Sequence, residues 1–239
     1  MRATTMALAG AAVALGTPAC AQSPDLPQKL ERRANAGSAE ARYHLGMLYN
    51  NGIGVAQDAR RAFAHFRASA EAGDPLGAYK LGCYYAGQFG SEAVAPDEAQ
   101  ALRWKLVAAR AGYSLAQLDI AIHYARREQW AEARAWFEVA ARQGDSQALF
   151  ALYVIYTEGL GTTASRPQSE AMLRLARLAS RRRLHDHAEQ ELAELAAAMS
   201  TSERVEAQRI AASFVTGPTE LTRRALRGIE RAEEVAAGR

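Results

Sequence analysis

Hydrophobic residues along most of this chain recur at the spacing of an α-helix. Four times, an aliphatic residue is followed four positions later by a tyrosine, which places both side chains on one face of a helix. The four pairs are Leu45 with Tyr49, Leu81 with Tyr85, Ile120 with Tyr124, and Leu152 with Tyr156. The pattern predicts a series of helices that each bury one apolar face, and the fourfold recurrence predicts that the tyrosines are buried.

These pairs belong to a longer repeat. Four consecutive segments align, and they cover residues 37–72, 73–111, 112–143 and 144–182. Repeat lengths between about 30 and 40 residues are typical of solenoid proteins. The second half of each segment carries small residues, where two helices can approach closely. They are Ala62, Ala101, Ala133 and Ala171, followed by Ala70, Ala109, Ala141 and Ala179. Each segment is therefore predicted to form one pair of helices.

Closely spaced glycines between the two helices of a repeat raise the question of a phosphate-binding loop. Gly52 and Gly54 lie in the first copy, and "TEGLGT" repeats the pattern at Gly159 and Gly161. A phosphate-binding glycine loop leads into the N-terminus of a helix. These glycines instead follow a helix, where glycine favours the left-handed conformation that ends it. The third copy, "HYARREQWAEA", has no glycine loop at all. We therefore interpret the glycines as turns.

Helix boundaries are marked by residues whose side chains accept backbone N–H groups. Asp58 and Asp97 precede the second helix of the first two copies and are expected to be N-caps. Beyond the repeats, Ser200 with Glu203 forms a capping-box pattern. A stop at Thr216-Gly217-Pro218 then separates a last helix, about 219–237, whose apolar stripe is Leu221, Ala225 and Ile229.

The repeat resembles the Sel-one-like repeat, a relative of the tetratricopeptide repeat. Copy one matches the family pattern at Ala41, Tyr43, Leu45, Gly46, Tyr49, Gly52, Gly54, Val55, Asp58, Ala62, Phe66, Ala70 and Gly73. Copy two matches it at Tyr79, Leu81, Gly82, Tyr85, Asp97, Ala101, Trp104, Ala109 and Gly112. Copies three and four depart from it, because Ala121 and Tyr153 replace the helix glycine and Arg182 replaces the closing glycine. The resemblance implies an all-α fold, a right-handed α-solenoid of about four helix-turn-helix repeats.

Segments on both sides of the repeat array are expected to cap it. Residues 22–36 look like the second helix of a preceding half repeat, and residues 183–239 form the predicted C-terminal helical cap. Caps of this kind cover the repeat faces that would otherwise be exposed at the two ends of a solenoid. The array itself is predicted to cover residues 37–182.

The first residues have the pattern of an export signal. An apolar run from Met6 to Leu15 is followed by Ala19 and Ala21, and this A-x-A pattern predicts cleavage after residue 21, before Gln22. We expect a periplasmic or secreted protein with no membrane span. Cys20 offers an alternative, a lipoprotein, although the preceding residues fit that pattern less well. If Cys20 leaves with the signal, Cys83 is the only cysteine, and the protein has no internal disulfide.

Composition adds little to this picture. Hydrophobic residues make up 49% of the chain, the net charge is +3, and the sequence pI is about 9.0. The charges of both signs are interspersed, so we expect no nucleic-acid partner. His185 and His187 are two residues apart and cannot share a metal on a helix. No catalytic motif is present, and we expect neither an enzyme nor a cofactor nor a metal. His65 stands where the repeat packs an aromatic residue, which indicates a structural role.

The candidate binding site is the concave surface that the resemblance assigns to the first helix of each repeat. The candidate residues are Tyr43, Met47, Asn50, Asn51, Tyr79, Cys83, Leu118, Ile122, Arg126, Phe150, Val154 and Glu158. This surface is apolar with a polar edge, a combination that often marks binding sites. Tyr43 has an alternative interpretation, because the family pattern includes it and it then packs inside. Arg181-Arg182-Arg183 is interpreted first as a solvated helix end and alternatively as a contact for an acidic partner or lipid headgroups.

Three hypotheses for function follow. The first is an exported, non-enzymatic scaffold that binds a protein or peptide partner, possible envelope partners included, through its concave face. The second is a periplasmic immunity protein that blocks a secreted toxin such as a lipase effector, a role known among Sel-one-like proteins. The third is a hydrolase related to β-lactamases, although the paired cysteines of those relatives are absent here. The sequence alone does not identify the partner.

Overall fold

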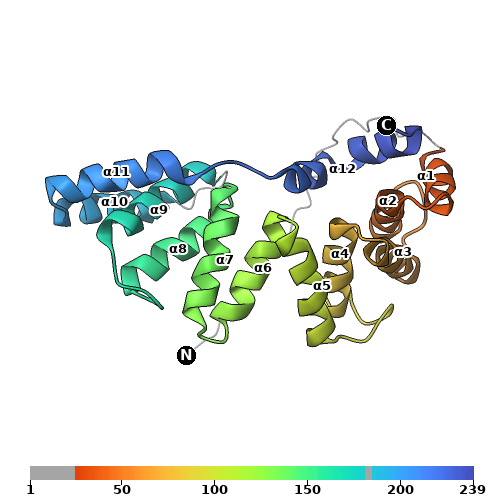
Figure 1. Cartoon of the computed structure of the whole chain (residues 1–239), viewed down its shortest axis with the longest axis horizontal. Coiled ribbons are helices and arrows are strands. Elements are labelled where there is room, and N and C mark those ends of the chain that lie inside the picture. Colours follow the sequence, from red (N-terminus) through yellow and green to blue (C-terminus); the bar gives the residue numbers. More distant parts are fainter. Residues whose placement is uncertain (1–24, 181–184) are drawn as a thin grey trace, which may run out of the picture.

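Helices follow one another in an elongated, curved row (Figure 1). The computed structural model describes residues 25–180 and 185–239, with side chains described outside 181–187, and every regular element in these ranges is an α-helix. The helices are α1 Leu26–Asn35, α2 Ala39–Asn51, α3 Ala59–Glu71, α4 Pro75–Tyr85, α5 Glu98–Arg110, α6 Ser114–Ala125, α7 Trp130–Arg142, α8 Ser146–Glu158, α9 Arg166–Ala179, α10 His185–Ala198, α11 Thr201–Phe214 and α12 Glu220–Ala237. None of these helices is both long and apolar enough to cross a membrane.

The predicted repeats correspond to four helix pairs, α2 with α3, α4 with α5, α6 with α7, and α8 with α9. From α1 to α10, each helix packs against the next one in the chain, as in a solenoid. The repeated aliphatic residues are buried in all four copies: Leu45, Leu81, Ile120 and Leu152. The predicted all-α repeat fold is confirmed. The helix α1 packs before the first pair, in the place expected for an N-terminal cap.

The turns inside the repeats are built as the sequence predicts. Gly52 and Gly159 end α2 and α8 in the left-handed conformation, with φ of 67° and 70°. The side chain of Asp58 accepts a hydrogen bond from the N–H of Arg61, and that of Asp97 accepts one from Gln100. These contacts confirm the interpretation of the glycines as turns and of the aspartates as N-caps.

The repeated tyrosines are not all buried, contrary to the expectation from their recurrence. Tyr49 and Tyr156 are 7% and 4% exposed, whereas Tyr85 and Tyr124 are only partly buried. What recurs in every copy is a backbone contact, because each tyrosine carbonyl accepts the N–H of the residue that precedes the second helix. The four N–H donors are Asp58, Asp97, Gln129 and Ser165.

Tyr84 takes the interior position in the second repeat. Its side chain is fully buried among the rings of Phe63, Phe66 and Phe89. Its hydroxyl donates a hydrogen bond to Oδ1 of Asn50 over 2.9 Å. The second repeat is therefore anchored to the first through the residue next to the recurring tyrosine.

The C-terminal segment divides into two parts with different positions. Helices α10 and α11 pack against α9 and extend the far end of the array, as a cap would. The capping box of Ser200 and Glu203 is confirmed, and α11 ends before the predicted stop. Residues 215–219 then lead back along the array to α12, which packs against α1 and α2 (Figure 1). The last helix thus covers the first repeat instead of the last one.

Candidate protein-interaction surface

The predicted concave residues fall into three environments. Tyr43 and Met47 of the first repeat lie under α12, Tyr79 and Cys83 of the second lie between neighbouring helices, and Leu118, Ile122 and Phe150 of the third and fourth line an open apolar groove. The array is thus not one continuous binding surface, although its first helices share one sequence pattern.

In the first repeat, Tyr43 is 7% exposed and packs against the rings of His44 and Phe66. Burial raises the pKa of its phenol well above the ordinary range. Met47 is partly buried and lines a cavity that α12 closes. The alternative interpretation of Tyr43 as an interior residue is the one that the structure bears out. Oδ1 of Asn50 accepts the hydrogen bond from the Tyr84 hydroxyl, and the next residue, Asn51, is exposed.

In the second repeat, the ring of Tyr79 meets the edge of Tyr113, with 4.9 Å between the ring centroids. Cys83 is 2% exposed, and burial raises the pKa of its thiol. A buried thiol of raised pKa is a poor nucleophile. Tyr79 therefore packs against the residue that precedes α6, and Cys83 is buried and not presented to a partner.

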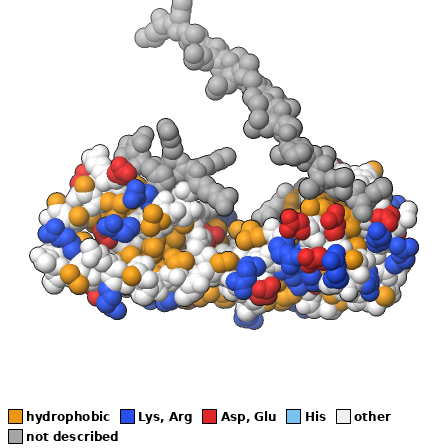
Figure 2. Space-filling model, turned by 90° about the horizontal axis from the view of Figure 1, so that it is seen from above, with side chains coloured by type: hydrophobic (Ala, Val, Ile, Leu, Met, Phe, Trp, Pro, Cys, Tyr) orange, Lys and Arg blue, Asp and Glu red, His pale blue; other side chains and the backbone are white. Residues whose placement is uncertain are grey.

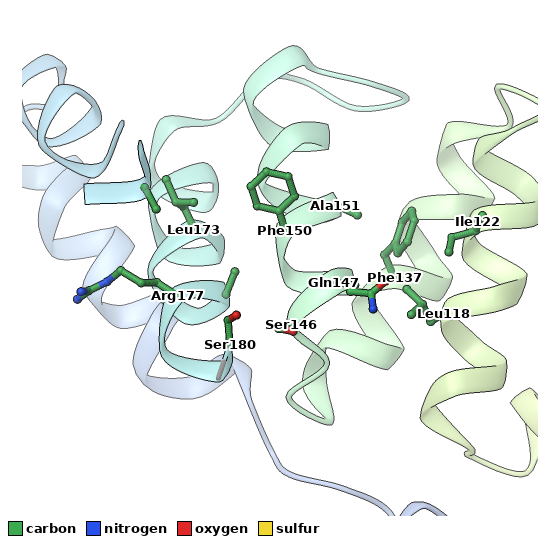
Figure 3. A pocket seen from close by; sticks show the side chains of 12 residues that line it. Leu118, Ile122, Phe137, Ser146, Gln147, Phe150, Ala151, Leu173, Arg177 and Ser180 are labelled. Atoms are coloured by element: carbon green, nitrogen blue, oxygen red, sulfur yellow. The ribbon is translucent and has the colours of Figure 1, made fainter. Parts of the chain in front are cut away.

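The third and fourth repeats leave an apolar groove open, hereafter the open groove (Figure 3). Its volume is about 400 Å³. The lining residues come from α6, α7, α8, α9, the residue that follows α9, and α10: Leu118, Ile122, Phe137, Ser146, Gln147, Phe150, Ala151, Leu173, Ala176, Arg177, Ser180 and Ala188. Three predicted residues, Leu118, Ile122 and Phe150, are brought together here. Phe150 is 38% exposed although it is apolar.

Side chains from the second helices complete the open groove. Phe137, Leu173 and Arg177 were missed by the sequence prediction, which considered only the first helix of each repeat. Their helical spacing predicts that they are buried or partly buried. It does not predict that they border a groove. Arg177 lies at the rim, where its Nη1 donates to Oε1 of Glu189 over 3.1 Å.

A polar depression of about 410 Å³ adjoins the open groove at Ile122. Arg126 lies here, beside Arg127, which contacts Glu98, and beside Lys105, which contacts Asp119 over 2.6 Å. Burial, together with the charge of Arg127, lowers the pKa of His123 in the same depression. Arg126 therefore places a charged group in the depression beside the open groove.

The remaining candidates have no common site. Val154 is partly buried and Glu158 is the exposed last residue of α8, and neither lines the open groove. His65 stacks on Tyr49 with 5.4 Å between ring centroids, which fits its predicted structural role. Within residues 25–180 and 188–239, no group of three or more His, Cys, Asp or Glu side chains could hold a metal ion. The export signal, Cys20, Arg181-Arg182-Arg183 and the side chains of His185 and His187 lie outside the described residues.

A family model of the Sel1 repeat matches residues 39–74, 75–113 and 131–145. The chain contains Sel1 repeats. The matches follow the first two helix pairs and the second helix of the third, so that the family resemblance seen in the sequence is confirmed. The Sel1 repeat is a scaffold of the protein-interaction type. No curated protein matches the sequence.

One of the solved structures that match this chain supports a shared fold. The Sel1 repeat protein from Oxalobacter formigenes is 18% identical and aligns over 90% of this chain and 87% of its own, with a TM-score of 0.58. The immunity protein Pa5087 from Pseudomonas aeruginosa is 17% identical over 66% of this chain and 83% of its own, with a TM-score of 0.34. The protective antigen c5321 of uropathogenic Escherichia coli strains is 20% identical over 84% and 58%, with a TM-score of 0.32. Only the TM-score of the Oxalobacter formigenes protein, among these three, is high enough to indicate a shared fold.

Proposed function

We propose that this Sel1-repeat protein is an exported, non-catalytic scaffold that binds an apolar segment of a partner protein in the open groove. The observation that supports this function is the groove itself. Exposed Phe150 and partly exposed Ile122 face it from two neighbouring repeats, and the groove interior is mostly apolar. The volume of the groove lies within the range of clefts that bind ligands in other proteins.

The polar surroundings of the groove suggest how a partner would be oriented. Arg126 lies in the adjoining depression, and Gln147 and Arg177 lie at the groove. An apolar floor with a few polar groups at its margin is the usual composition of a recognition site, since the apolar part supplies affinity and the polar groups select the orientation. The export part of the proposal rests on the signal pattern of residues 1–21.

Substitutions at the floor of the groove test the proposal. Ile122→Glu and Phe150→Glu place a charge against the apolar surface of a bound partner, so each should abolish capture of a specific protein from an envelope extract. Val139→Glu is the matched control, because Val139 is 44% exposed on α7 and does not line the groove. Quantitative mass spectrometry of the captured proteins provides the readout. Equal capture by all folded variants would refute the proposed site.

The identity of the captured protein would then define the role. If it is a secreted toxin, such as a lipase effector, the scaffold acts as an immunity protein, and the toxin's activity should fall in the presence of wild-type protein but not of Ile122→Glu. If it is an envelope protein without toxic activity, the scaffold has a role in assembly.

A further inference from the structure

The open groove and the polar depression beside it meet at one residue of α6. Ile122 lines both, and Arg126 follows it by four residues at the end of α6, which puts the two side chains on the same face of the helix. On the face seen in Figure 2, apolar side chains gather over the half of the molecule that holds α8 to α11, whereas basic and acidic side chains are densest over the other half, at α12. A partner segment that covers Ile122 therefore lies next to Arg126.

The other basic side chains that line the groove and the depression are each paired with a carboxylate. The pairs are Lys105 with Asp119, Arg127 with Glu98 and, at the rim of the groove, Arg177 with Glu189. His123 also lines the depression, and because its pKa is lowered from 6.5 it adds no charge at neutral pH. The positive charge that these pairs leave over is that of Arg126.

Arg126 is exposed at the depression. Its guanidinium forms no salt bridge and no hydrogen bond with any residue that the structure describes, in contrast to Arg127 next to it. A guanidinium is always charged and presents its N–H donors in a fixed fork that matches the two oxygens of a carboxylate. The surface beside the apolar floor is therefore complementary to a negative group.

We propose that the segment that occupies the open groove carries an acidic side chain, Asp or Glu, which pairs with Arg126. This inference rests on the proposed function and adds the charge of the partner to it. The apolar side chains of the segment bind the floor at Ile122 and Phe150. The carboxylate determines the direction of the segment, because the cation at the other end of the groove, Arg177, already has Glu189 as its partner.

The pair with Arg126 selects among apolar segments more than it adds to their affinity. It lies at the margin of the groove, where water still reaches one side of it, and such pairs contribute less than buried ones. We therefore expect the carboxylate to improve binding by about fivefold over a neutral side chain of the same shape.

The first experiment identifies the segments that the groove accepts. The probe is a library of random peptides displayed through their C-termini, so that no peptide has a free terminal carboxylate and an acidic preference reports on side chains. Selection uses the full chain, and a parallel selection on Ile122→Glu identifies peptides that bind elsewhere. Peptides that depend on Ile122 should share an Asp or Glu at a fixed position relative to their large apolar residues.

The second experiment assigns the preference to Arg126. One selected peptide is synthesised with its acidic residue and with the corresponding amide, both with an amidated C-terminus, and fluorescence anisotropy measures the affinities. The amide should weaken binding about fivefold to the wild-type protein and not at all to Arg126→Gln, as in a double-mutant cycle. Arg110→Gln is the matched control, because Arg110 is an exposed arginine of α5 that lines neither the groove nor the depression.

Two results would overturn this inference and leave the proposed function in place. One is a set of peptides that depend on Ile122 but share no acidic position. The other is a preference for the acidic peptide that is the same in Arg126→Gln and in Arg110→Gln. A library that yields no peptide dependent on Ile122 would overturn the proposed function together with the inference.

Discussion

Arg231 and Glu40 are 191 residues apart in the chain and form a two-bond ion pair, with Nε and Nη2 of the arginine 2.8 and 2.9 Å from the two carboxylate oxygens. The pair connects the last helix to the first repeat. Burial alone would raise the pKa of Glu40, but the nearby His44 imidazole, the hydrogen bonds from Arg231 and the charge of Arg224 outweigh it and lower the pKa to about 2.

This lowered pKa predicts an acid-sensitive attachment of α12. The folded pKa lies below the ordinary value of 4.5, so Glu40 contributes stability above that value and loses it as the pH falls toward 2. Glu40→Gln should lower the free energy of unfolding by about 1–3 kcal/mol at pH 7. Thermal unfolding of both proteins from pH 7 to pH 2 measures the difference, which should shrink below pH 4.5. A constant difference across this range would contradict the assignment.

Gln143 forms a second attachment between the repeat array and the start of α12. Its Nε2 donates to Gly112 O and Gln117 Oε1 over 2.9 and 2.8 Å, and its Oε1 accepts from Thr219 N and Thr222 Oγ1 over 3.0 and 2.7 Å. Gln143→Ala should destabilise the protein by about 2 kcal/mol, because several partly buried groups lose their partner together. Urea unfolding provides the measurement. Gln147→Ala, at an exposed glutamine, is the control and should change stability by less than about 0.5 kcal/mol.

The neighbouring tyrosines of α4 should differ in their effect on stability. Tyr84 is fully buried, whereas Tyr85 is only partly buried. Tyr84→Ala should therefore cost about 3–5 kcal/mol and Tyr85→Ala about 1–2 kcal/mol, since the cost follows the apolar volume removed from the interior. Denaturant unfolding of the two variants is a direct comparison. Equal costs would contradict this prediction, and a reversed order would show that the recurring tyrosine anchors the repeat.

Gly161 allows a test of the turn interpretation. It has φ of 63°, and a Cβ atom there would lie 2.7 Å from Cβ of Trp130 and 2.8 Å from N of Ala131. Gly161→Ala should cost about 2–4 kcal/mol through strain and overpacking. Gly90 is the matched control, because its φ is 80° and no atom lies within 4 Å of the added Cβ. Gly90→Ala should cost about 1 kcal/mol in the same thermal unfolding assay.

The export prediction concerns the mature N-terminus. Expression of the whole chain in a Gram-negative host should yield a periplasmic protein that begins at Gln22, because signal peptidase cuts after the A-x-A pattern. Intact mass and N-terminal sequencing identify the first residue. A mature form that begins at an acylated Cys20 would indicate a lipoprotein instead, and an uncleaved cytoplasmic chain would contradict both forms of the prediction.

Local features of the fold were predictable from the sequence because their causes are local. A glycine that ends a helix, such as Gly52, acts within one turn, and an N-cap such as Asp58 reaches only three residues ahead. The repeat adds independent copies of each signal. The predicted burial of Tyr85 was wrong. The recurring feature at this position is a backbone hydrogen bond, and the side chain that fills the interior is that of Tyr84.

The position of α12 could not be predicted in this way. Its apolar stripe shows that the helix needs a surface, but the sequence does not say which one, and nothing near Arg231 points to Glu40. The same limit applies to the candidate site. The family register assigns Met47 and Ile122 equivalent places, yet α12 covers the first, and the second stays open where α6 and α8 border the groove.

The return of α12 has a consequence for the order of folding. In a simple solenoid each repeat meets only its neighbours, so the first repeat can reach its final state while the rest is still being made. Here the first repeat is completed only after α12 has been made, because α12 follows all four repeats in the chain and contact over such a sequence distance is slow. During that interval, the carboxylate of Glu40 and the apolar side chains of α2 face solvent or whatever protein accompanies the emerging chain.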